Sequence, residues 1–270
     1  MGILSTEKIL MGVEWMDFKD KLEIRHNAER IFHDRKYSKE NGKGTLYEMG
    51  FTAPILSRML GMLGDLNGKK VVDFGCGSGW LSEILLRRGA EVWAFDISEE
   101  AVKRSREVGK KIGMAARIHA DVMSAEAMAY EGDFFDAVVG TAILHHLDLR
   151  LAANEIHRIL KKGGKAYFME PLGHNPVINL YRRLTPWLRS SDEKPLRKND
   201  FRCFRERFGK VDMKAYYLLS ILALFWYYIV RREDLMIRTR NILFHTDELL
   251  VRALPALQKY CWYAILVLEK

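Results

Sequence analysis

The sequence predicts an α/β fold built on a mostly parallel seven-stranded sheet whose last strand is antiparallel. Three observations predict it: short apolar segments alternate with helical segments from residue 67 onward, a glycine-rich turn follows the first of them directly, and the chain ends in an apolar segment at residues 262–268. Alternating strands and helices bring helices to both faces of a parallel sheet.

Residues 1–66 are expected to form a helical cap in front of the sheet. Residues 16–37 are charged and amphipathic, and residues 51–63 carry apolar side chains at helical spacing. Asn41-Gly42-Lys43-Gly44 interrupts them with a glycine-rich break. We therefore expect two helices joined by a turn.

Five strands and three helices are expected between residues 67 and 172. The first helix ends at Gly89, Ser98 is a candidate cap for the second, and Asp148 caps a third that ends before the basic and glycine residues 161–164. The strands are expected at 70–74, 91–95, 116–119, 135–139 and 165–169, and the helices at 80–88, 99–112 and 148–160.

After Glu170 the alternation stops. Four prolines punctuate a polar stretch, a strand is expected near residues 211–217, and a helical insertion over roughly 218–258 precedes the final strand. The last two strands should form an antiparallel pair at the edge of the sheet. Residues 67–270 would then be one domain, with insertions over 172–260.

The glycine turn carries the first functional signal. Gly75, Gly77 and Gly79 directly follow an apolar strand, where glycine lets the backbone approach a ligand closely. The dinucleotide fingerprint requires a glycine at the position occupied by Trp80, so that fingerprint fails. Asp73 instead places a carboxylate at the strand end, which suits a ligand with an ammonium group and would repel a pyrophosphate.

Two further aspartates follow strand ends. Asp96 ends the second strand, where a carboxylate can accept hydrogen bonds from both ribose hydroxyls. Asp121 follows the third strand, where it could accept from an adenine amino group. One such aspartate is usually a helix cap or a solvated loop residue, but three at successive strand ends favour a nucleoside site.

These segments resemble the successive motifs of class I methyltransferases. The resemblance rests on Val71 to Gly79, Ala94 to Ser98, Ala120 to Val122, Phe135 to Leu147 and Glu155 to Gly164, and it spans roughly residues 68–172. It implies a Rossmann-like fold and S-adenosylmethionine as cofactor, in a subgroup that acts on small molecules and lipids. By position it implies these cofactor-binding residues: Asp73, Gly75, Cys76, Gly77, Asp96, Ile97, Asp121, Val122, Thr141, Ala142 and His146.

The acceptor side carries weaker signals. Methyl transfer needs a general base only if the acceptor must lose a proton, and His145, His146 and Glu170 are the candidate catalytic residues because they follow the fourth and fifth strands. The alternative is that these histidines only pack and orient the loop. Tyr37, Tyr47 and Phe51 are candidate lid residues, and Arg182, Arg183 and Arg189 could bind a substrate phosphate or carboxylate, or pair with Asp192 and Glu193.

Residues 216–230 form an uncharged, aromatic-rich stretch flanked by Lys214 and Arg231-Arg232. As a helix it would span only about 22 Å, short of the roughly 30 Å hydrocarbon core of a bilayer. It could be a buried element, a wall of an apolar acceptor site, or an interfacial anchor that gives peripheral membrane contact.

Composition limits the remaining classes. The net charge is +8, but the basic residues are scattered, so nucleic acid is not an expected partner. Three distant cysteines form neither a disulfide framework nor metal-ligand spacing, and no secretory signal is evident, so we expect a cytoplasmic protein. The sequence favours methyl transfer to a hydrophobic small molecule or lipid. The alternatives are an RNA or protein methyltransferase and a non-catalytic S-adenosylmethionine-binding protein.

Overall fold

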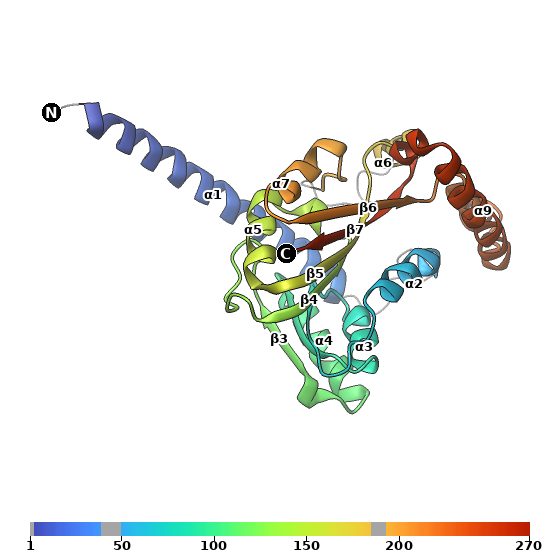
Figure 1. The fold of residues 1–270 in the computed structure, drawn as a ribbon, viewed down its shortest axis with the longest axis horizontal. Coiled ribbons are helices and arrows are strands. Elements are labelled where there is room, and N and C mark those ends of the chain that lie inside the picture. The colour runs from blue at the N-terminus through green and yellow to red at the C-terminus, as the bar shows by residue number, and fades with distance from the viewer. Residues whose placement is uncertain (1–2, 39–49, 185–192) are drawn as a thin grey trace.

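The structure is a computed structural model that describes residues 3–38, 50–184 and 193–270, with side chains from Asp20 onward. Its centre is a seven-stranded sheet in the order β3-β2-β1-β4-β5-β7-β6 (Figure 1). The strands are β1 (Lys70–Phe74), β2 (Glu91–Asp96), β3 (Ile118–Val122), β4 (Phe135–Thr141), β5 (Leu160–Pro171), β6 (Lys210–Tyr216) and β7 (Tyr263–Glu269).

The first five strands run parallel, and β7 pairs antiparallel with both β5 and β6. The predicted fold class is therefore confirmed. The strand order reverses between β1 and β4, and ligands of such sheets bind beyond the carboxyl ends of the strands at this point.

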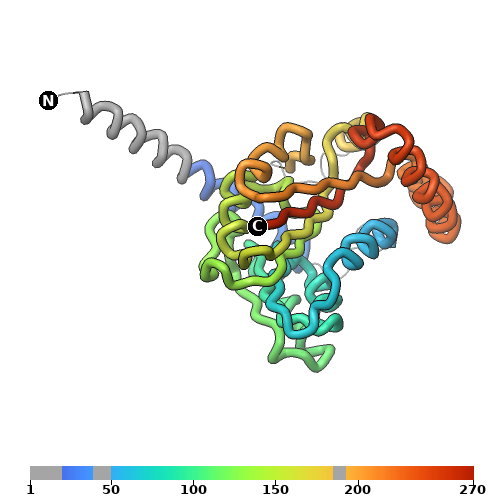
Figure 2. The backbone as a smooth tube through the Cα atoms, in the orientation of Figure 1, coloured from blue at the N-terminus to red at the C-terminus, as the bar shows by residue number. Residues whose placement is uncertain are grey.

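Two cores cover the two faces of the sheet, as strand alternation requires. Val71 belongs to one core with α2 (Ala53–Met62), α3 (Trp80–Arg87) and α4 (Glu99–Lys111). Val72 belongs to the other with α5 (Leu149–Ile159) and α7 (Arg202–Arg205). The tube view follows the backbone in the same orientation and places the C-terminal end of β7 in the middle of the molecule (Figure 2).

The two predicted helix caps are confirmed. The Ser98 side chain accepts a hydrogen bond from the Ala101 N–H and begins α4, and Asp148 accepts from the N–H groups of Arg150 and Leu151 and begins α5. The helix α1 (Ile3–Ser38) is longer than the predicted 16–37. The break predicted at residues 41–44 lies outside the described residues.

Two strand boundaries were predicted incorrectly. The strand β3 starts at Ile118 because a 3-10 turn, η1 (Ala115–Arg117), occupies the residues before it, and it runs on through Asp121. The strand β5 starts at Leu160, which pairs with Phe135, whereas residues 161–164 were expected to lie outside the strand. Gly163 has a φ of +73° there, which glycine adopts without strain.

The stretch 216–230 is not one helix. Tyr217, with φ +64°, directly follows β6, and the chain continues as η5 (Ser220–Ala223) and α8 (Leu224–Tyr228). Tyr217 is fully buried, whereas Phe225 and Ile229 are exposed. The predicted helical insertion is completed by α9 (Glu233–Ala253) and η6 (Pro255–Tyr260). Within the described part of the chain, none of the helices is long and apolar enough to cross a membrane.

Asp247 of α9 holds this insertion against the sheet. Its carboxylate, 2 % exposed, accepts hydrogen bonds from the N–H groups of Leu218, Leu219 and Ser220 and from the Ser220 hydroxyl, at 2.5–3.0 Å. One carboxylate therefore accepts hydrogen bonds from the three backbone N–H groups at the junction between β6 and η5. The helix α6 (Pro176–Leu184) precedes this region and contacts α8 through the rings of Tyr181 and Tyr228.

Candidate functional site

The glycine turn after β1 has the backbone geometry predicted for it. Gly75, Gly77 and Gly79 have φ values of +75°, +52° and +81°, in the left-handed region that side chains other than glycine rarely adopt. A Cβ added at Gly75 would lie 2.8 Å from the Ile143 side chain. The turn therefore depends on glycine both for its conformation and for its close packing.

A small pocket lies beyond this turn at the carboxyl edge of the sheet. It is walled by the ends of β1, β2 and β4, by the loop after β3 and by α1. Its lining residues are Arg25, His26, Glu29, His33, Tyr37, Gly75, Phe95, Asp96, Ile97, Met123, Ser124, Ala125, Thr141, Ala142, Ile143, His146 and Leu147. We call it the donor pocket. It includes the predicted residues Gly75, Asp96, Ile97, Thr141, Ala142 and His146.

Asp96 joins the glycine turn to the second strand. Its carboxylate accepts hydrogen bonds from the backbone N–H of Gly77 and of Ser98, both at 3.0 Å. Burial raises the pKa of Asp96, and these two N–H donors and the charge of His33 act in the opposite direction. A buried carboxylate fixed in this way presents an acceptor to the pocket.

Asp73 and Cys76 lie beneath the turn and do not line the donor pocket. Burial raises the pKa of Asp73 to about 7, although the Ser82 hydroxyl donates to its carboxylate at 2.5 Å. Burial also raises the pKa of the Cys76 thiol. Both residues therefore support the turn from inside the protein, and their predicted contact with a cofactor stays a prediction.

Asp121 and Val122 face outward at the end of β3. Both side chains are exposed, and Asp121 lies 3.9 Å from the Arg106 guanidinium. The next three residues, Met123, Ser124 and Ala125, line the donor pocket instead. After β3, the side chains that line the donor pocket therefore lie slightly further along the chain than Asp121 and Val122.

Glu170 holds the turn after β4. One carboxylate oxygen accepts from the N–H groups of Ile143 and Leu144 at 2.8 and 2.9 Å, and the other lies 2.7 Å from Nδ1 of His145. Burial lowers the pKa of His145, while Glu170 opposes that shift. Glu170 and His145 are thus engaged with each other and with the backbone. Just before them Ala142 has a φ of +53°, a conformation that costs about 1–3 kcal/mol and is found at functional sites.

His146 is only partly buried, and its ring centroid lies 4.2 Å from that of His145. It lines the donor pocket and a second, larger cavity. Its Nδ1 lies 3.4 Å from the Glu29 carboxylate, and its ring lies 5.6 Å from that of His33. The ligand atoms of Glu29, His33 and His146 all lie within 4.8 Å of one another, a spacing that a metal ion could bridge.

The helix α1 covers the donor pocket. Arg25 and His26 both bind the Glu126 carboxylate. Burial alone would raise the pKa of Glu126, but these two partners and the Asp148 N–H have the larger combined effect, so the pKa of Glu126 is lowered. Asp34 accepts from the Ser98 hydroxyl at 2.5 Å. With α1 in place the pocket holds about 90 Å³, whereas ligand pockets measure about 300–1,000 Å³. While α1 lies over it, the pocket is therefore narrower than a typical ligand site.

Sequence reasoning identified only Tyr37 among the α1 residues at the pocket. Residues 26, 29, 33 and 37 follow helical spacing, and all four are polar and at least half-buried on one face. That polar stripe, on a helix predicted to be amphipathic, was the available signal. Glu126 had no such signal because its partners come from distant segments.

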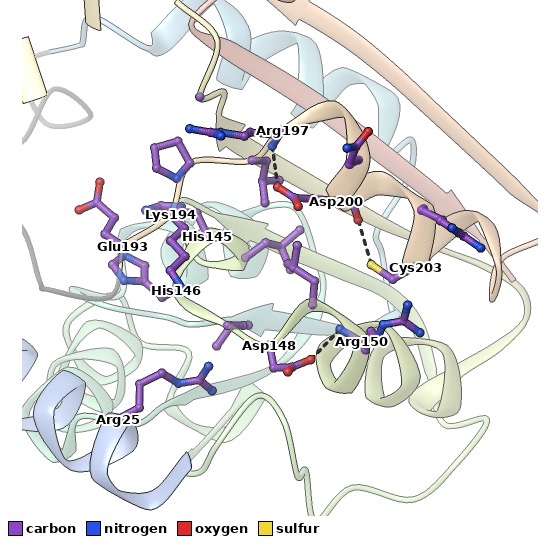
Figure 3. Close-up of a pocket in the computed structure, with 18 of the residues that line it drawn as sticks. Arg25, His145, His146, Asp148, Arg150, Glu193, Lys194, Arg197, Asp200 and Cys203 are labelled. Carbon is purple, nitrogen blue, oxygen red and sulfur yellow. Dashed lines mark hydrogen bonds between the residues drawn. The ribbon is translucent and has the colours of Figure 1, made fainter. Parts of the chain in front are cut away.

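The second cavity measures about 860 Å³ and meets the donor pocket at Arg25, His146 and Leu147 (Figure 3). We call it the acceptor cavity. Its walls come from the turn after β4, from α5 and α6, and from residues 193–203. Residues 216–230 line neither cavity, so the prediction that they wall the acceptor site is not supported.

The remaining predicted acceptor residues have mixed outcomes. Phe51 is fully buried and stacks on Tyr217, so it is a core residue and the lid prediction for it was wrong. Arg182 pairs with Glu193, one of the two predicted alternatives. His174 is exposed and accepts a hydrogen bond from the Lys198 N–H at 3.2 Å. Tyr47, Arg189 and Asp192 lie outside the described residues.

Sequence comparison finds relatives for the central part of the chain. Residues 72–168 match the family described as "Methyltransferase domain". Similar proteins include a ubiquinone biosynthesis O-methyltransferase of Xanthomonas oryzae pv. oryzae, 39% identical over 117 residues, which are 42% of this chain and 47% of the relative. The corresponding enzyme of Pseudomonas aeruginosa is 36% identical over 43% of this chain and 50% of its own.

The chain thus spans about half the length of the curated relatives it matches. Solved structures share the fold over more of the chain. The geranyl diphosphate C-methyltransferase of Streptomyces coelicolor A3(2) has a TM-score of 0.55 at 14% identity and covers 85% of this chain and 86% of its own. The cyclase SpnF has a TM-score of 0.55 at 17% identity and covers 86% and 84%.

Proposed function

We propose that this protein transfers a methyl group from S-adenosylmethionine to a small amphiphilic or lipid-like acceptor. The observation that carries the proposal is the meeting of two cavities at His146: a pocket formed by the glycine turn and Asp96, and a larger cavity beside it. Methyl transfer requires a donor and an acceptor held in line, and two adjoining cavities provide that arrangement.

The residues of the donor pocket fit the proposed cofactor. Asp96 would accept hydrogen bonds from the ribose hydroxyls, Met123 to Ala125 would flank the adenine, and the backbone at Gly75 would face the methionine part. S-adenosylmethionine, when bound, supplies a methyl group already activated by its sulfonium. The protein then has to orient the acceptor and exclude water, and α1 is suited to do so because it closes over the pocket.

His146 is our candidate for the residue that accepts a proton from the acceptor. It borders both cavities, and Glu29 lies 3.4 Å from its Nδ1, so that the carboxylate would hold the ring in place. His145 and Glu170 are better suited to positioning the loop, because their hydrogen bonds are directed at each other and at the backbone. The reaction assigned to the relatives, an O-methylation, would use such a base.

A membrane surface is a plausible source of the acceptor, and we propose that α6 and α8 contact one. Val177, Leu180 and Leu184 of α6 are 54–64 % exposed and lie on one helical face, and Phe225 and Ile229 are 53 and 69 % exposed. Exposed basic side chains at 183, 231 and 232 flank these apolar ones. Apolar and basic groups together are typical of helices that lie at a bilayer interface.

We consider two alternative functions beside this proposal. The fold alone does not fix the activity, since a protein described as a cyclase shares it. A non-catalytic S-adenosylmethionine-binding protein would use the donor pocket without methyl transfer, and an RNA or protein methyltransferase would show steep salt dependence of binding.

The test is calorimetric titration with S-adenosylhomocysteine, followed by turnover of labelled S-adenosylmethionine against a lipid and metabolite extract. Binding with transfer of label to a lipid-soluble product supports the proposal. Binding without any turnover would favour the non-catalytic alternative, and absence of binding to the folded protein would refute the donor assignment.

A further inference from the structure

The acceptor cavity carries an excess of positive charge. Six cationic side chains line it, Arg25, Arg150, Arg182, Lys194, Arg197 and Arg202, against three acidic ones, Asp148, Glu193 and Asp200. A neutral hydrophobic acceptor gives no reason for such a lining. Cations gathered in a concave surface concentrate the field and attract anionic ligands.

The three acids are already engaged within the protein. Asp148 caps α5 through the N–H groups of Arg150 and Leu151, and Asp200 accepts from the Arg197 N–H at 2.7 Å. Glu193 pairs with Arg182. Two of the three carboxylates are therefore directed at the backbone, and only one neutralises a cation of the cavity.

Two of the cations face the cavity without such a partner. Arg25 pairs with Glu126, and Arg202 pairs with Glu206 at 2.8 Å. Among the described residues, no ion pair engages the side chain of Lys194 or Arg197. Both side chains are exposed to the cavity solvent, and Figure 3 shows Lys194 beside the labelled histidines with Arg197 above it.

A short segment fixes the backbone of these two residues. The Lys194 N–H donates to the His145 carbonyl at 2.9 Å, and the Leu196 N–H donates to the Pro171 carbonyl at 3.1 Å. Leu196 is 1 % exposed and pairs with Leu172 as a parallel bridge beyond β5. Lys194 is thereby held next to His145, whose neighbour His146 borders both cavities.

We infer that the methyl acceptor carries a phosphate or diphosphate group, and that Lys194 and Arg197 bind it. The inference rests on the proposed function and narrows its substrate class. A guanidinium offers a planar fork that matches phosphate oxygens, and an ammonium adds a point charge beside it. A doubly or triply charged group uses both cations, whereas a neutral alcohol uses neither. The apolar part of the acceptor then extends along Leu144, Leu147 and Leu149 of the same cavity.

Calorimetry with inorganic pyrophosphate on the full chain, saturated with S-adenosylhomocysteine, tests this inference. Hydrogen bonds to charged groups contribute about 1.5 kcal/mol or more, so Lys194→Met and Arg197→Gln should each weaken pyrophosphate binding about tenfold. Lys198→Met and Arg205→Gln are the matched controls, because they remove the same charges from exposed positions outside the cavity. Pyrophosphate affinity in these controls should stay within about twofold of the wild type.

Two results would overturn the inference. One is the absence of pyrophosphate binding while S-adenosylhomocysteine binds normally, and the other is an equal loss of affinity in the cavity variants and the controls. Titration of S-adenosylhomocysteine into every variant keeps the two proposals separate. Loss of that binding in the wild type would refute the donor site, and a defect confined to pyrophosphate concerns only the acceptor.

Discussion

Replacing Asp96 with alanine removes the one carboxylate that joins the glycine turn to the end of β2 and faces the donor pocket. If Asp96 accepts hydrogen bonds from two ribose hydroxyls, the substitution removes two bonds to a charged group. Such bonds contribute about 1.5–3 kcal/mol each, so the loss is about 3–6 kcal/mol, or roughly a hundredfold to ten-thousandfold in the dissociation constant.

The assay is calorimetric titration with S-adenosylhomocysteine, with circular dichroism to establish that each variant is folded. Asp96→Asn keeps an oxygen that can accept from the Gly77 N–H, so it should fold like the wild type and bind with intermediate affinity. Asp121→Ala is the matched control, since this aspartate also lies at a strand end but is exposed and lies 3.9 Å from the Arg106 guanidinium. We expect the control to change the affinity by no more than about twofold. Equal binding by Asp96→Ala and the wild type, or an equal loss in Asp121→Ala, would refute the reasoning.

Three further predictions concern the pH dependence, the insertion and the lid. Burial raises the pKa of Asp73 from 3.8 to about 7, so between these pH values the native state binds a proton that the unfolded state has lost. The unfolding free energy should therefore fall as the pH rises from about 4 to about 7. Urea titrations of Asp73→Asn should lack this part of the decline. Asp247→Ala leaves three backbone N–H groups without their acceptor and should lower the unfolding free energy by about 3 kcal/mol or more. Asp234→Ala, at an exposed site on the same helix, should lower it much less, and equal effects of the two substitutions in urea titrations would contradict the anchoring role. Asp34→Ala removes the acceptor of the Ser98 hydroxyl and should increase the association rate of S-adenosylhomocysteine several-fold in stopped-flow measurements, and an unchanged rate would argue against opening of α1 as the limiting step.

The sequence predicted helix starts and the glycine turn correctly, because these features depend on residues close together in the chain. Ser98 and Asp148 cap their helices as expected, because a side-chain oxygen satisfies N–H groups only two or three residues away. The glycine turn was predictable for the same reason, since its φ values require glycine. Strand boundaries were less predictable: residues 161–164 join β5 because Leu160 pairs with Phe135 on another strand.

The site was predictable where residues follow strand ends and not where distant segments meet. Asp96 lines the pocket as expected, whereas Asp121 points outward because β3 continues through it and Met123 begins the loop that turns inward. Glu29 and His33 were missed since the position of α1 depends on contacts with Glu126 and Ser98, far along the chain. In the acceptor cavity, Arg182 was among the predicted acceptor-side residues, whereas Lys194 and Arg197 were missed, because residues 193–203 reach the cavity through a bridge to Leu172.

A crystal structure of the protein grown with S-adenosylhomocysteine tests the central claim most directly. We expect the ribose hydroxyls on the carboxylate of Asp96, the adenine beside Met123 to Ala125, and the side chains of His33 and Tyr37 moved out of the pocket, with α1 still covering the bound ligand. A ligand bound elsewhere on the sheet, or a donor pocket still filled by the side chains of His33 and Tyr37 at saturating ligand, would contradict it.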